Sequence, residues 1–590
     1  MSAVSGTPAL VVGVDVGGTF TDLFVLDERS GQARIVKVPS TRGEEARGFM
    51  NGIAQVTGSE GPDAARAIAT IVHGTTVGTN ALLERKVART GIITTRGFRD
   101  VLEMRRRDRP QTWGLRGSYT PVVPRALRLE VDERVLADGT LHTPVDLEQV
   151  KAQTQALLAA GCEAVCLFFI HGYANPANER AAAEVVRALW PNPHVTVASE
   201  VLPEIREFER CSTATLNAAL QPVVGSYLER LEGDLRAQGF GGELLVVQSN
   251  GGVMSRQTAC DVPVRTALSG PAAGVMACAE MARAAGFPNV ITGDMGGTSF
   301  DVSLIAQGQA ALAAQTAIEF GLVVRSPMIQ IETIGAGGGS IASVDAGGML
   351  QVGPESAGSV PGPACYMRGG DKPTITDCNA VLGYLSPDNF LGGKMKLDRK
   401  AALAAVESVA KPLGMGVQDA AEGIVRIINV KMQEACKAIS TMRGHDLRAF
   451  MLLAFGGAGP LHVNAVARLM GSWPAVSPVS PGVLCALGDA TTRMRTETAR
   501  SFSRLATATQ ADELIAILDE MAAQTRGELA ADGIKRTQFL HRLQGEITKR
   551  GVVDVLRKGV SHGPAHVDLY KLLPTPGNAS ATENFGKNIF

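Results

Sequence analysis

The 590-residue sequence predicts an α/β protein that consists of two similar lobes followed by a shorter C-terminal region. An octapeptide of the pattern D-x-G-G-T-x-x-D occurs twice, at residues 15–22 and 294–301. Each copy lies between two apolar runs, which is typical of a strand, a tight glycine turn and a second strand. We therefore expect a first lobe at residues 1–200, a second lobe at 201–500 and a further region at 501–590.

The repeated octapeptide has the composition of a phosphate-binding hairpin. Paired glycines permit positive φ angles and let the backbone approach a ligand without a Cβ atom in the way. Turn amides and the threonine hydroxyl can then donate to phosphate oxygens, while the leading Asp can hold a hydrated Mg²⁺. One copy is weak evidence, because any β-hairpin can use Asp and Gly-Gly for its turn, but two copies favour two lobes around one phosphate chain. The candidate residues are Asp15, Gly17, Gly18, Thr19, Thr21 and Asp22 in the first copy, and Asp294, Gly296, Gly297, Thr298 and Asp301 in the second.

A second candidate element follows the strand expected at residues 68–74. The strand runs into a small, hydroxylated turn that contains Thr75, Thr76 and Asn80, and a helix follows. These short polar side chains either contact a ligand or cap the helix, and their position does not decide between the two.

A third candidate element is the glycine turn that contains Gly456, Gly457 and Gly459. It lies between an expected strand (450–455) and a helix with proline in its first turn, where the missing N–H has no cost. Backbone amides at such a turn can face a flat ring or a phosphate, so it is a plausible nucleotide-binding element.

Several other segments predict local structure without a function. Residues 334–340 are too rich in glycine for a helix or an interior strand, so their backbone must bend sharply or press against another part of the chain. Apolar residues at 424, 428, 432, 435 and 439 predict one face of a helix. Pro222 should kink or divide the long helical region after residue 204. The basic cluster at 105–109 is expected on a solvated face, with contact to an anion or a partner as the alternative.

Composition excludes several classes of protein. A net charge of −1 gives no reason to expect binding to nucleic acid or to an anionic membrane. Nine scattered cysteines without a C-x-x-C pair predict reduced thiols in a cytoplasmic protein. The N-terminus lacks a basic region, and its apolar stretch is interrupted at Asp15, so we expect a strand there and not a signal peptide. No uncharged apolar run reaches the roughly 18 residues that span a bilayer.

Together, these residues resemble the actin, sugar-kinase and heat-shock-chaperone ATPase superfamily. In that two-lobed, actin-like fold each lobe supplies a phosphate hairpin, and a late Gly-Gly turn contacts adenosine. A closer resemblance, over about residues 10–500, is to the hydantoinase A/5-oxoprolinase family. The motifs that carry it are residues 13–22, His73-Gly-Thr-Thr-Val, 79–85, Ser269-Gly-Pro-Ala-Ala-Gly274, 335–340, 352–358 and Pro361-Gly-Pro-Ala-Cys-Tyr366.

The resemblance implies a subunit that uses ATP and Mg²⁺ to phosphorylate an amide-like or carbonyl oxygen. A partner subunit of the hydantoinase B type then completes hydrolysis of a cyclic amide, such as a hydantoin, N-methylhydantoin or a 5-oxoproline-like lactam. The alternative is the ATP-using subunit of an acetone or acetophenone carboxylase, with a ketone substrate. Either implies a hetero-oligomer. By the resemblance, Asp15 and Asp294 organise Mg²⁺, while Asp22 or Asp301 orients the acceptor or only buttresses its own hairpin.

Two further functions would use the same nucleotide cleft. A stand-alone small-molecule kinase would need a substrate base within its own lobes. A chaperone-like module would use ATP to switch lobe closure, but no peptide-binding domain is recognisable after residue 500. Neither accounts for the family-specific motifs.

The resemblance weakens after about Gly533. Family members continue into a further domain, which residues 535–590 do not resemble, so we expect a truncated, frame-altered or divergent region. Residues 539–556 have helix-like stretches, 574–580 are loop-like, and the whole tail is expected to pack poorly against the lobes.

Overall fold

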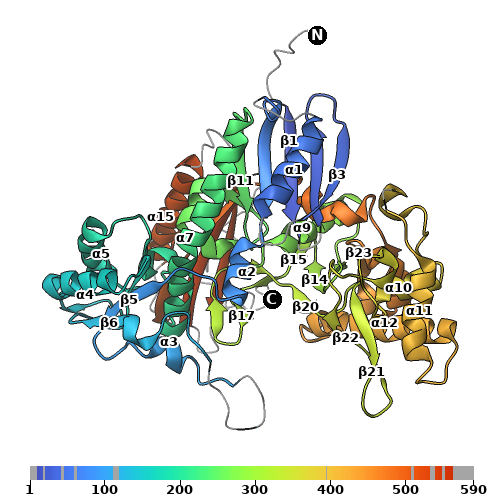
Figure 1. Ribbon diagram of the computed structural model, residues 1–590. Coiled ribbons are helices and arrows are strands. Elements are labelled where there is room, and N and C mark those ends of the chain that lie inside the picture. Colours follow the sequence, from blue (N-terminus) through green and yellow to red (C-terminus); the bar gives the residue numbers. More distant parts are fainter. Residues whose placement is uncertain are drawn as a thin grey trace, which may run out of the picture.

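The computed structural model describes residues 9–17, 20–40, 45–58, 63–109, 114, 119–393, 395–505, 511–531, 539–547 and 552–562. Two lobes lie on either side of a common centre, with the first strands at the top of the view and the second lobe's sheet below and to the right (Figure 1). The predicted α/β class with duplicated lobes is confirmed by the order of the strands in the two principal sheets.

The first lobe contains a six-stranded sheet with β1 near its middle. β1 pairs antiparallel with β2, and β2 with β3, while β4 and β11 lie parallel to β1 on its other side. Alternate residues of β1 are valines packed in the core, as expected for a β-branched strand between covered faces. In spatial order the strands are β12 (Val253–Ser255), β11 (Glu243–Val247), β4 (Ile68–Gly74), β1 (Leu10–Val16), β2 (Phe20–Asp27) and β3 (Ala33–Pro39).

The second lobe repeats this arrangement. β13 pairs antiparallel with β14, β14 with β15, and β23 and β24 lie parallel to β13 on the other side. The sequence therefore encodes the same strand order twice, as the repeated octapeptide predicts. The strands are β15 (Gln309–Ala310), β14 (Phe300–Ala306), β13 (Val290–Met295), β23 (Met451–Phe455) and β24 (Ala475–Val476), with β20 (Glu332–Ile334) beside β14.

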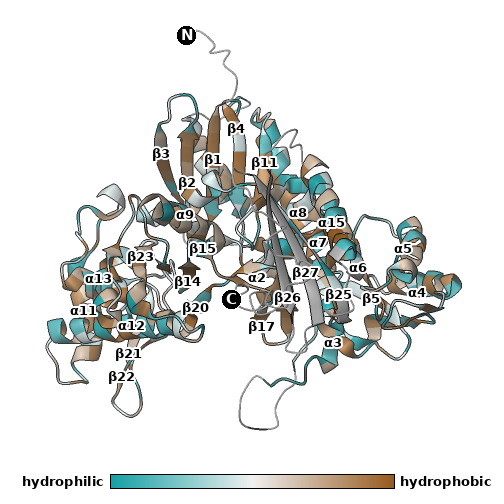
Figure 2. Ribbon diagram, turned by 180° about the vertical axis from the view of Figure 1, so that it is seen from behind, coloured by the Kyte–Doolittle hydropathy of each residue, from teal (hydrophilic) through white to brown (hydrophobic). Residues whose placement is uncertain are grey.

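Helices cover both sheets and join them at the centre. The predicted helix at 421–440 lies within α12, whose buried face includes Ile424, Ile428, Met432 and Ile439. The brown strands of the first sheet in Figure 2 contrast with the mixed colours of the surrounding helices. The principal helices are α1 (Glu45–Thr57), α2 (Val77–Leu83), α7 (Glu207–Ala237), α9 (Gly270–Ala284), α10 (Ile375–Val381), α11 (Arg399–Ala410), α12 (Val417–Thr441), α13 (Gly459–Met470) and α14 (Leu484–Thr491).

A smaller parallel sheet extends from the first lobe. Its two central strands are buried along their whole length, as in parallel sheets covered on both faces: β9 is an apolar run, and β5 places Ile92 and Ile93 between buried threonines. The strand expected at 195–200 ends at Val197, where α6 (Ala198–Val201) begins. The strands are, in spatial order, β10 (Val195–Val197), β9 (Ala164–Phe168), β5 (Thr90–Thr95) and β6 (Arg128–Val131), with α4 (Leu147–Ala159) and α5 (Ala177–Leu189) packed against each other.

Short elements complete the two lobes. The helices are α3 (Val101–Met104) and α8 (Arg256–Asp261). The two-stranded pairs are β7 (Arg134–Val135) with β8 (Leu141–Thr143), β16 (Leu312–Ala313) with β19 (Met328–Ile329), β17 (Thr316–Glu319) with β18 (Leu322–Val324), and β21 (Ser340–Val344) with β22 (Leu350–Ser356).

Three expectations about this part of the chain require correction or restriction. Pro222 does not divide its helix, because α7 runs through it from Glu207 to Ala237. The basic cluster is not simply a solvated face: the Arg105 guanidinium stacks on the rings of Tyr119 and Phe320, and Arg106 pairs with Glu209. The first sheet takes in β11 and β12, which follow the boundary expected near residue 200, so that boundary stays a prediction.

The C-terminal region forms a separate three-stranded sheet, and the helix-like pattern expected at 539–556 is wrong. The strands β25 and β26 both pair antiparallel with β27, which is the middle strand of this sheet. The region joins the first lobe where Val253 bridges Met494. Residues 535–538, 548–551 and 563–590, including 574–580, lie outside the described residues, so the packing prediction is not tested for them. The elements are β25 (Arg495–Leu505), α15 (Ala511–Ala531), β26 (Phe539–Ile547) and β27 (Val552–His562).

Candidate functional site

The two octapeptides fold into hairpins of the same geometry. Asp15 stands opposite Asp22 in the register of β1 and β2, and Asp294 opposite Asp301 in β13 and β14. The first turn is closed by a hydrogen bond from the N–H of Gly17 to the carbonyl of Phe20, at 3.0 Å. The N–H of Gly296 donates to the carbonyl of Ser299 at 3.1 Å, which is the same bond at the same motif position. The predicted strand–turn–strand reading is therefore confirmed for both copies.

The leading carboxylates of the two hairpins, Asp15 and Asp294, lie at the centre of the molecule and influence each other. Both are half-buried. Burial and the charge of Asp22 raise the pKa of Asp15 to about 7, against a smaller opposing effect of Lys37. Burial, Asp301 and then Asp15 raise the pKa of Asp294 to about 8. The charge of Asp15 in the first lobe thus acts on Asp294 in the second.

The second carboxylate of each motif is bound to its own lobe. Asp22 forms an ion pair with Lys37 of β3, whose Nζ lies 2.6 and 2.8 Å from the two oxygens. Asp301 accepts hydrogen bonds from Thr333 Oγ1 at 2.5 Å and Ser299 Oγ at 3.3 Å. These contacts agree with the alternative that Asp22 and Asp301 each support their own hairpin and do not orient the acceptor.

The threonines of the hairpins differ in their surroundings. Thr21 is fully buried, and its Oγ1 lies 2.9 Å from Ser40 Oγ, so its hydroxyl is engaged within the lobe. Thr298 is exposed at the tip of the second hairpin, together with Gly297. Gly18 and Thr19, predicted at the first tip, lie outside the described residues.

The glycine-rich segment at 334–340 presses against the second hairpin, as one of the two expectations for it required. The N–H groups of Gly338 and Gly339 donate to the carbonyls of Gly296 and Gly297, at 3.0 and 2.7 Å. A Cβ atom on Gly337 would lie 2.5 Å from Gly297 C and Thr298 N. Glycine is therefore required for this close approach of two backbones.

The third glycine turn, after β23, packs on the same hairpin. Gly456 has a φ of +80°, and a Cβ there would overlap Asp294 Oδ1 and lie 2.6 Å from the carbonyl of Met295. Gly457 is exposed and has open space around its Cα, whereas Gly459 is buried at the start of α13. The turn thus holds Asp294 in place and leaves one glycine backbone accessible.

The first hairpin faces the N-terminus of α9 and the turn after β4. A Cβ on Gly270 would lie 4.0 Å from Asp15 Oδ1 and 3.9 Å from Thr76 Cγ2. Thr75 is buried, and its Oγ1 accepts from the N–H of Val77 at 3.2 Å. Thr76 occupies the N-cap position of α2, but within the part of the chain that the structure describes its side chain makes no capping bond and only accepts from Asn80 Nδ2, at 3.3 Å. The structure thus leaves the Thr76 hydroxyl proton available to a ligand.

A helix that was not predicted from the sequence, α14, packs against β1 and β2 of the first hairpin and contacts Asp294 of the second. Cys485 Sγ lies 3.5 Å from Asp294 Oδ2, and Asp489 of the same helix lies against Gly74, the register partner of Asp15. Gly13 is needed here, because a Cβ would overlap the carbonyl of Ala486. The one signal in the sequence is an acidic residue in an otherwise apolar and small segment, residues 484–490.

The residues present fit a nucleotide with a bound Mg²⁺. Mg²⁺ commonly keeps several waters and uses one or two carboxylates together with substrate phosphates, which Asp15 and Asp294 would supply. Two helices of sufficient length, α9 and α13, begin at glycines beside these carboxylates, where backbone N–H groups favour phosphate. Within the part of the chain described, no three His, Cys, Asp or Glu side chains form a group that could hold a metal ion by themselves. The site therefore suits a metal that arrives with phosphate.

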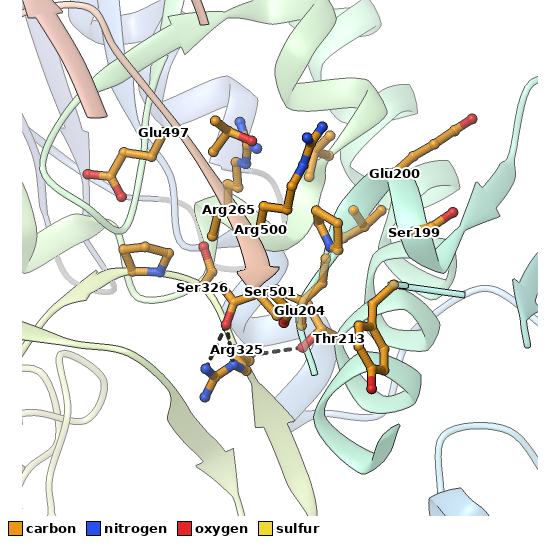
Figure 3. A pocket seen from close by; sticks show the side chains of 18 of the residues that line it. Ser199, Glu200, Glu204, Thr213, Arg265, Arg325, Ser326, Glu497, Arg500 and Ser501 are labelled. Carbon is orange, nitrogen blue, oxygen red and sulfur yellow. Dashed lines mark hydrogen bonds and ion pairs between the residues drawn. The ribbon is translucent and has the colours of Figure 1, made fainter. Parts of the chain in front are cut away.

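A cavity of about 760 Å³ lies where the first lobe meets the C-terminal sheet. Arg325 lies within it, bound to Glu204 at 2.6 Å and, through its N–H, to Thr213 Oγ1 at 2.9 Å (Figure 3). The Arg265 and Ser501 side chains also line it. Among the described residues, none that lines the cavity belongs to either octapeptide. Residues that follow the carboxyl ends of β10 and β11 line the cavity, and this is the edge at which α/β proteins bind ligands.

The structure adds two general findings. All nine cysteines are free thiols, eight of them buried. No helix in the described ranges is both long and apolar enough to cross a membrane.

Comparison with known proteins identifies the family. The hydantoinase/oxoprolinase N-terminal region matches residues 11–190, and the hydantoinase/oxoprolinase family model matches residues 210–498. Caprolactamase subunit alpha of Pseudomonas jessenii is 39% identical over 485 residues, which are 81% of this chain and 69% of the relative. Acetophenone carboxylase gamma subunit of Aromatoleum aromaticum is 36% identical over 510 residues, 83% of this chain and 69% of the relative. Both are named as subunits.

A solved structure agrees with the sequence relatives. The crystal structure of ATP-dependent caprolactamase from Pseudomonas jessenii superimposes with a TM-score of 0.84 and 32% sequence identity, over 96% of this chain and 90% of that one. The two-lobed fold and the order of the motifs thus have the same origin as those of ATP-dependent relatives. The chain belongs to the hydantoinase/oxoprolinase family.

Proposed function

We propose that this chain is the ATP-using subunit of a two-subunit cyclic amide hydrolase. It phosphorylates the carbonyl oxygen of a hydantoin or lactam, and a partner subunit of the hydantoinase B type completes ring opening. The observation that carries this proposal is the pair of like hairpins that bring Asp15 and Asp294 together in a chain of this family. An unstrained amide resists water, and phosphorylation of its oxygen creates a leaving group, so the reaction needs ATP.

The chain's own residues position the reactants and balance their charge, which is the main contribution of a protein to phosphoryl transfer. Asp15 and Asp294 would hold Mg²⁺, and bound ATP would supply the phosphoryl group. Thr76, Thr298 and the accessible backbone at Gly457 would donate to the nucleotide. Asp22 and Asp301 keep the two hairpins rigid through their bonds within each lobe.

We place the amide substrate in the cavity of about 760 Å³. One segment joins the cavity to the nucleotide site: Arg265 lines the cavity, and Gly270, five residues later, faces Asp15. Five residues span at most about 18 Å, and the turn at 263–266 shortens this distance. The guanidinium of Arg265, half-buried in the cavity, offers hydrogen-bond donors to a carbonyl or carboxylate.

A carboxylase subunit with a ketone substrate is the second candidate. The similarity to acetophenone carboxylase gamma subunit favours it, since it is nearly as strong as the similarity to caprolactamase subunit alpha. Both candidates imply a hetero-oligomer, and the nine free thiols agree with a reducing, cytoplasmic location.

Isotope transfer tests the proposal directly. The chain and its partner are incubated with ATP, Mg²⁺ and a cyclic amide that carries ¹⁸O in its carbonyl group. We expect one ¹⁸O atom in each phosphate released, because the carbonyl oxygen becomes the bridging oxygen and leaves with phosphorus. Unlabelled phosphate would contradict phosphorylation of the amide. ATP turnover that needs a ketone and bicarbonate, and not an amide, would establish the second candidate instead.

The division of labour and the cavity have their own tests. The chain without its partner should not release ring-opened product, and efficient turnover by the chain alone would contradict the two-subunit proposal. Arg265→Met should raise KM for the amide while nucleotide affinity stays unchanged. Exposed Arg283, which pairs with Glu280 on the surface of α9, provides the control variant Arg283→Met, since neither residue of this pair is among those that line the cavity.

A further inference from the structure

Asp489 is a buried carboxylate that the rest of the chain does not satisfy. It is 1% exposed, and neither carboxylate oxygen has a hydrogen-bond partner among the described residues. Burial and then the charge of Asp15 raise the pKa of Asp489 well above its usual value, and the nearby N–H of Gly74 opposes this shift without forming a hydrogen bond within the usual distance and angle limits. A buried carboxylate without a partner is among the most destabilising features a fold can contain.

Asp377 is a buried carboxylate of the same chain whose oxygens do have hydrogen-bond donors, and it serves as a comparison for Asp489. Asp377 is fully buried and accepts bonds from Cys365 N–H at 2.8 Å, Ala364 N–H at 3.2 Å and Thr374 Oγ1 at 2.7 Å. It forms a capping box at the start of α10, which is a structural role. Asp489 has no such role at its position, because it lies in the last turns of α14.

The position of Asp489 ties it to the hairpins. Its Oδ2 and Oδ1 would lie 3.0 and 3.2 Å from a Cβ on Gly74, the residue paired with Asp15. Four residues earlier on the same helix face, Cys485 contacts Asp294. The helix α14 is packed closely against α9, since a Cβ on Gly488 would overlap the carbonyl of Ala273 in α9. This packing restricts its movement away from the hairpins. The same helix therefore contacts Asp294 through Cys485 and the register partner of Asp15 through Asp489.

We propose that Asp489 is a positioning residue of the cation site, placed behind Asp15. This inference rests on the proposed function, since it assumes that Asp15 and Asp294 hold a hydrated cation. Asp489 supplies further negative charge and two acceptor oxygens on the first-lobe side, and it strengthens the hold of that side on the cation. The fold accepts an unsatisfied acid at this place because the cation compensates it.

The test uses Mn²⁺ as the probe, with ADP, on the full chain. We compare the parent with Asp489→Asn, which keeps the shape and removes the charge, and measure the Mn²⁺ dissociation constant by electron paramagnetic resonance. Loss of an outer partner of a metal typically weakens affinity about 10- to 100-fold, and we expect this for Asp489→Asn. ADP affinity in the presence of a chelator should not change. The matched control is the surface variant Asp446→Asn, which should bind Mn²⁺ as the parent does.

The unfolding temperature distinguishes a positioning role of Asp489 from a structural role. Loss of a structural residue lowers this temperature, whereas loss of an unsatisfied buried acid does not. Without divalent cations, Asp489→Asn should unfold at the same temperature as the parent or at a higher one, because it removes an unsatisfied acid. The buried control Asp377→Asn should unfold at a lower temperature, since it loses bonds that the fold needs. Mn²⁺ with ADP should stabilise the parent more than Asp489→Asn.

The outcomes separate this inference from the proposed function. Parental Mn²⁺ affinity in Asp489→Asn, or a clear loss of cation-free stability, would overturn the role of Asp489 alone. A parent that binds no Mn²⁺ with ADP would overturn both this inference and the nucleotide site between the lobes.

Discussion

The two hairpins share their sequence pattern, register and turn closure, yet their leading carboxylates lie in different surroundings. Beside Asp15, the ammonium of Lys37 pairs with Asp22 and partly offsets the negative charge. Beside Asp294, the partners of Asp301 among the described residues are two hydroxyl groups, and Gly456 lies directly against the Asp294 carboxylate. The pKa of Asp294 is accordingly raised to about 8, and that of Asp15 to about 7.

This difference shows that a duplicated motif does not imply duplicated chemistry. In the first hairpin, the positive charge of Lys37 partly offsets the charges of Asp22 and Asp15. A Cβ on Gly270 of α9 would meet only ordinary contacts with Asp15 and Thr76. The second is held by backbone from two glycine-rich segments, which fixes Asp294 sterically. We therefore expect the second hairpin to be sensitive to changes of shape that the first tolerates, and we expect the proton affinity of the first to depend on Lys37.

The largest effect is expected from removal of a leading carboxylate. Asp294→Ala should reduce amide-dependent ATP hydrolysis more than about 100-fold, because it removes a ligand of the cation itself. The fold should remain, since Asp294 lies half-buried at the end of β13 and the substitution removes an unfavourable buried charge. Phosphate release and circular dichroism measure the two properties, and parental hydrolysis by this variant would refute the assignment.

A steric change should distinguish the hairpins next. Gly456→Ala places a Cβ against Asp294 and forces alanine into a positive φ, which costs about 1–2 kcal/mol of unfolding free energy. Its Mn²⁺ affinity should fall as well. Gly270→Ala meets only ordinary contacts near Asp15, at 3.9 and 4.0 Å, and should be tolerated. Equal losses in both variants, by chemical denaturation and Mn²⁺ titration, would contradict the difference between the hairpins.

The pH dependence follows from the raised pKa values of Asp15 and Asp294. A cation must displace protons from these groups, so Mn²⁺ affinity should increase as the pH rises through about 7 and about 8. Cation-free stability has the opposite slope. The folded state retains protons that the unfolded state releases above its ordinary value of 3.8, so this contribution is complete below 3.8 and is lost towards pH 8. Cation affinity that is constant across this range would show that neither carboxylate binds the metal.

The smallest effect is expected from Lys37→Met, which makes the first hairpin resemble the second. The pair with Asp22 is partly exposed, so its loss should change cation affinity by about 1 kcal/mol or less. The pH at which the cation binds should move upward, because Lys37 lowers the pKa of Asp15. The same measurement on Arg448→Met, a surface ion pair far from the hairpins in sequence, provides the control.

The repeated octapeptide made the two-lobed fold predictable, because glycine and Asp positions fix a turn locally. Long segments with a regular apolar spacing, such as α12, were equally predictable from the sequence. Residues 539–556 were misjudged, since their pairing with β25 depends on partners distant in the sequence. Lys37, Cys485 and Asp489 could not be assigned from spacing, because only the folded chain brings β3 and α14 to the hairpins. The burial of Arg105 between two rings was hidden for the same reason.

The central claim is that the two leading carboxylates act on one cation held between the lobes. A double-mutant cycle of Asp15→Asn and Asp294→Asn, measured as Mn²⁺ affinity in the presence of ADP, tests it most directly. If both residues hold the same ion, either single variant removes most of the affinity, and the double variant is hardly weaker than the worse single one. Independent effects that multiply in the double variant would contradict the claim and would place the two carboxylates at separate sites.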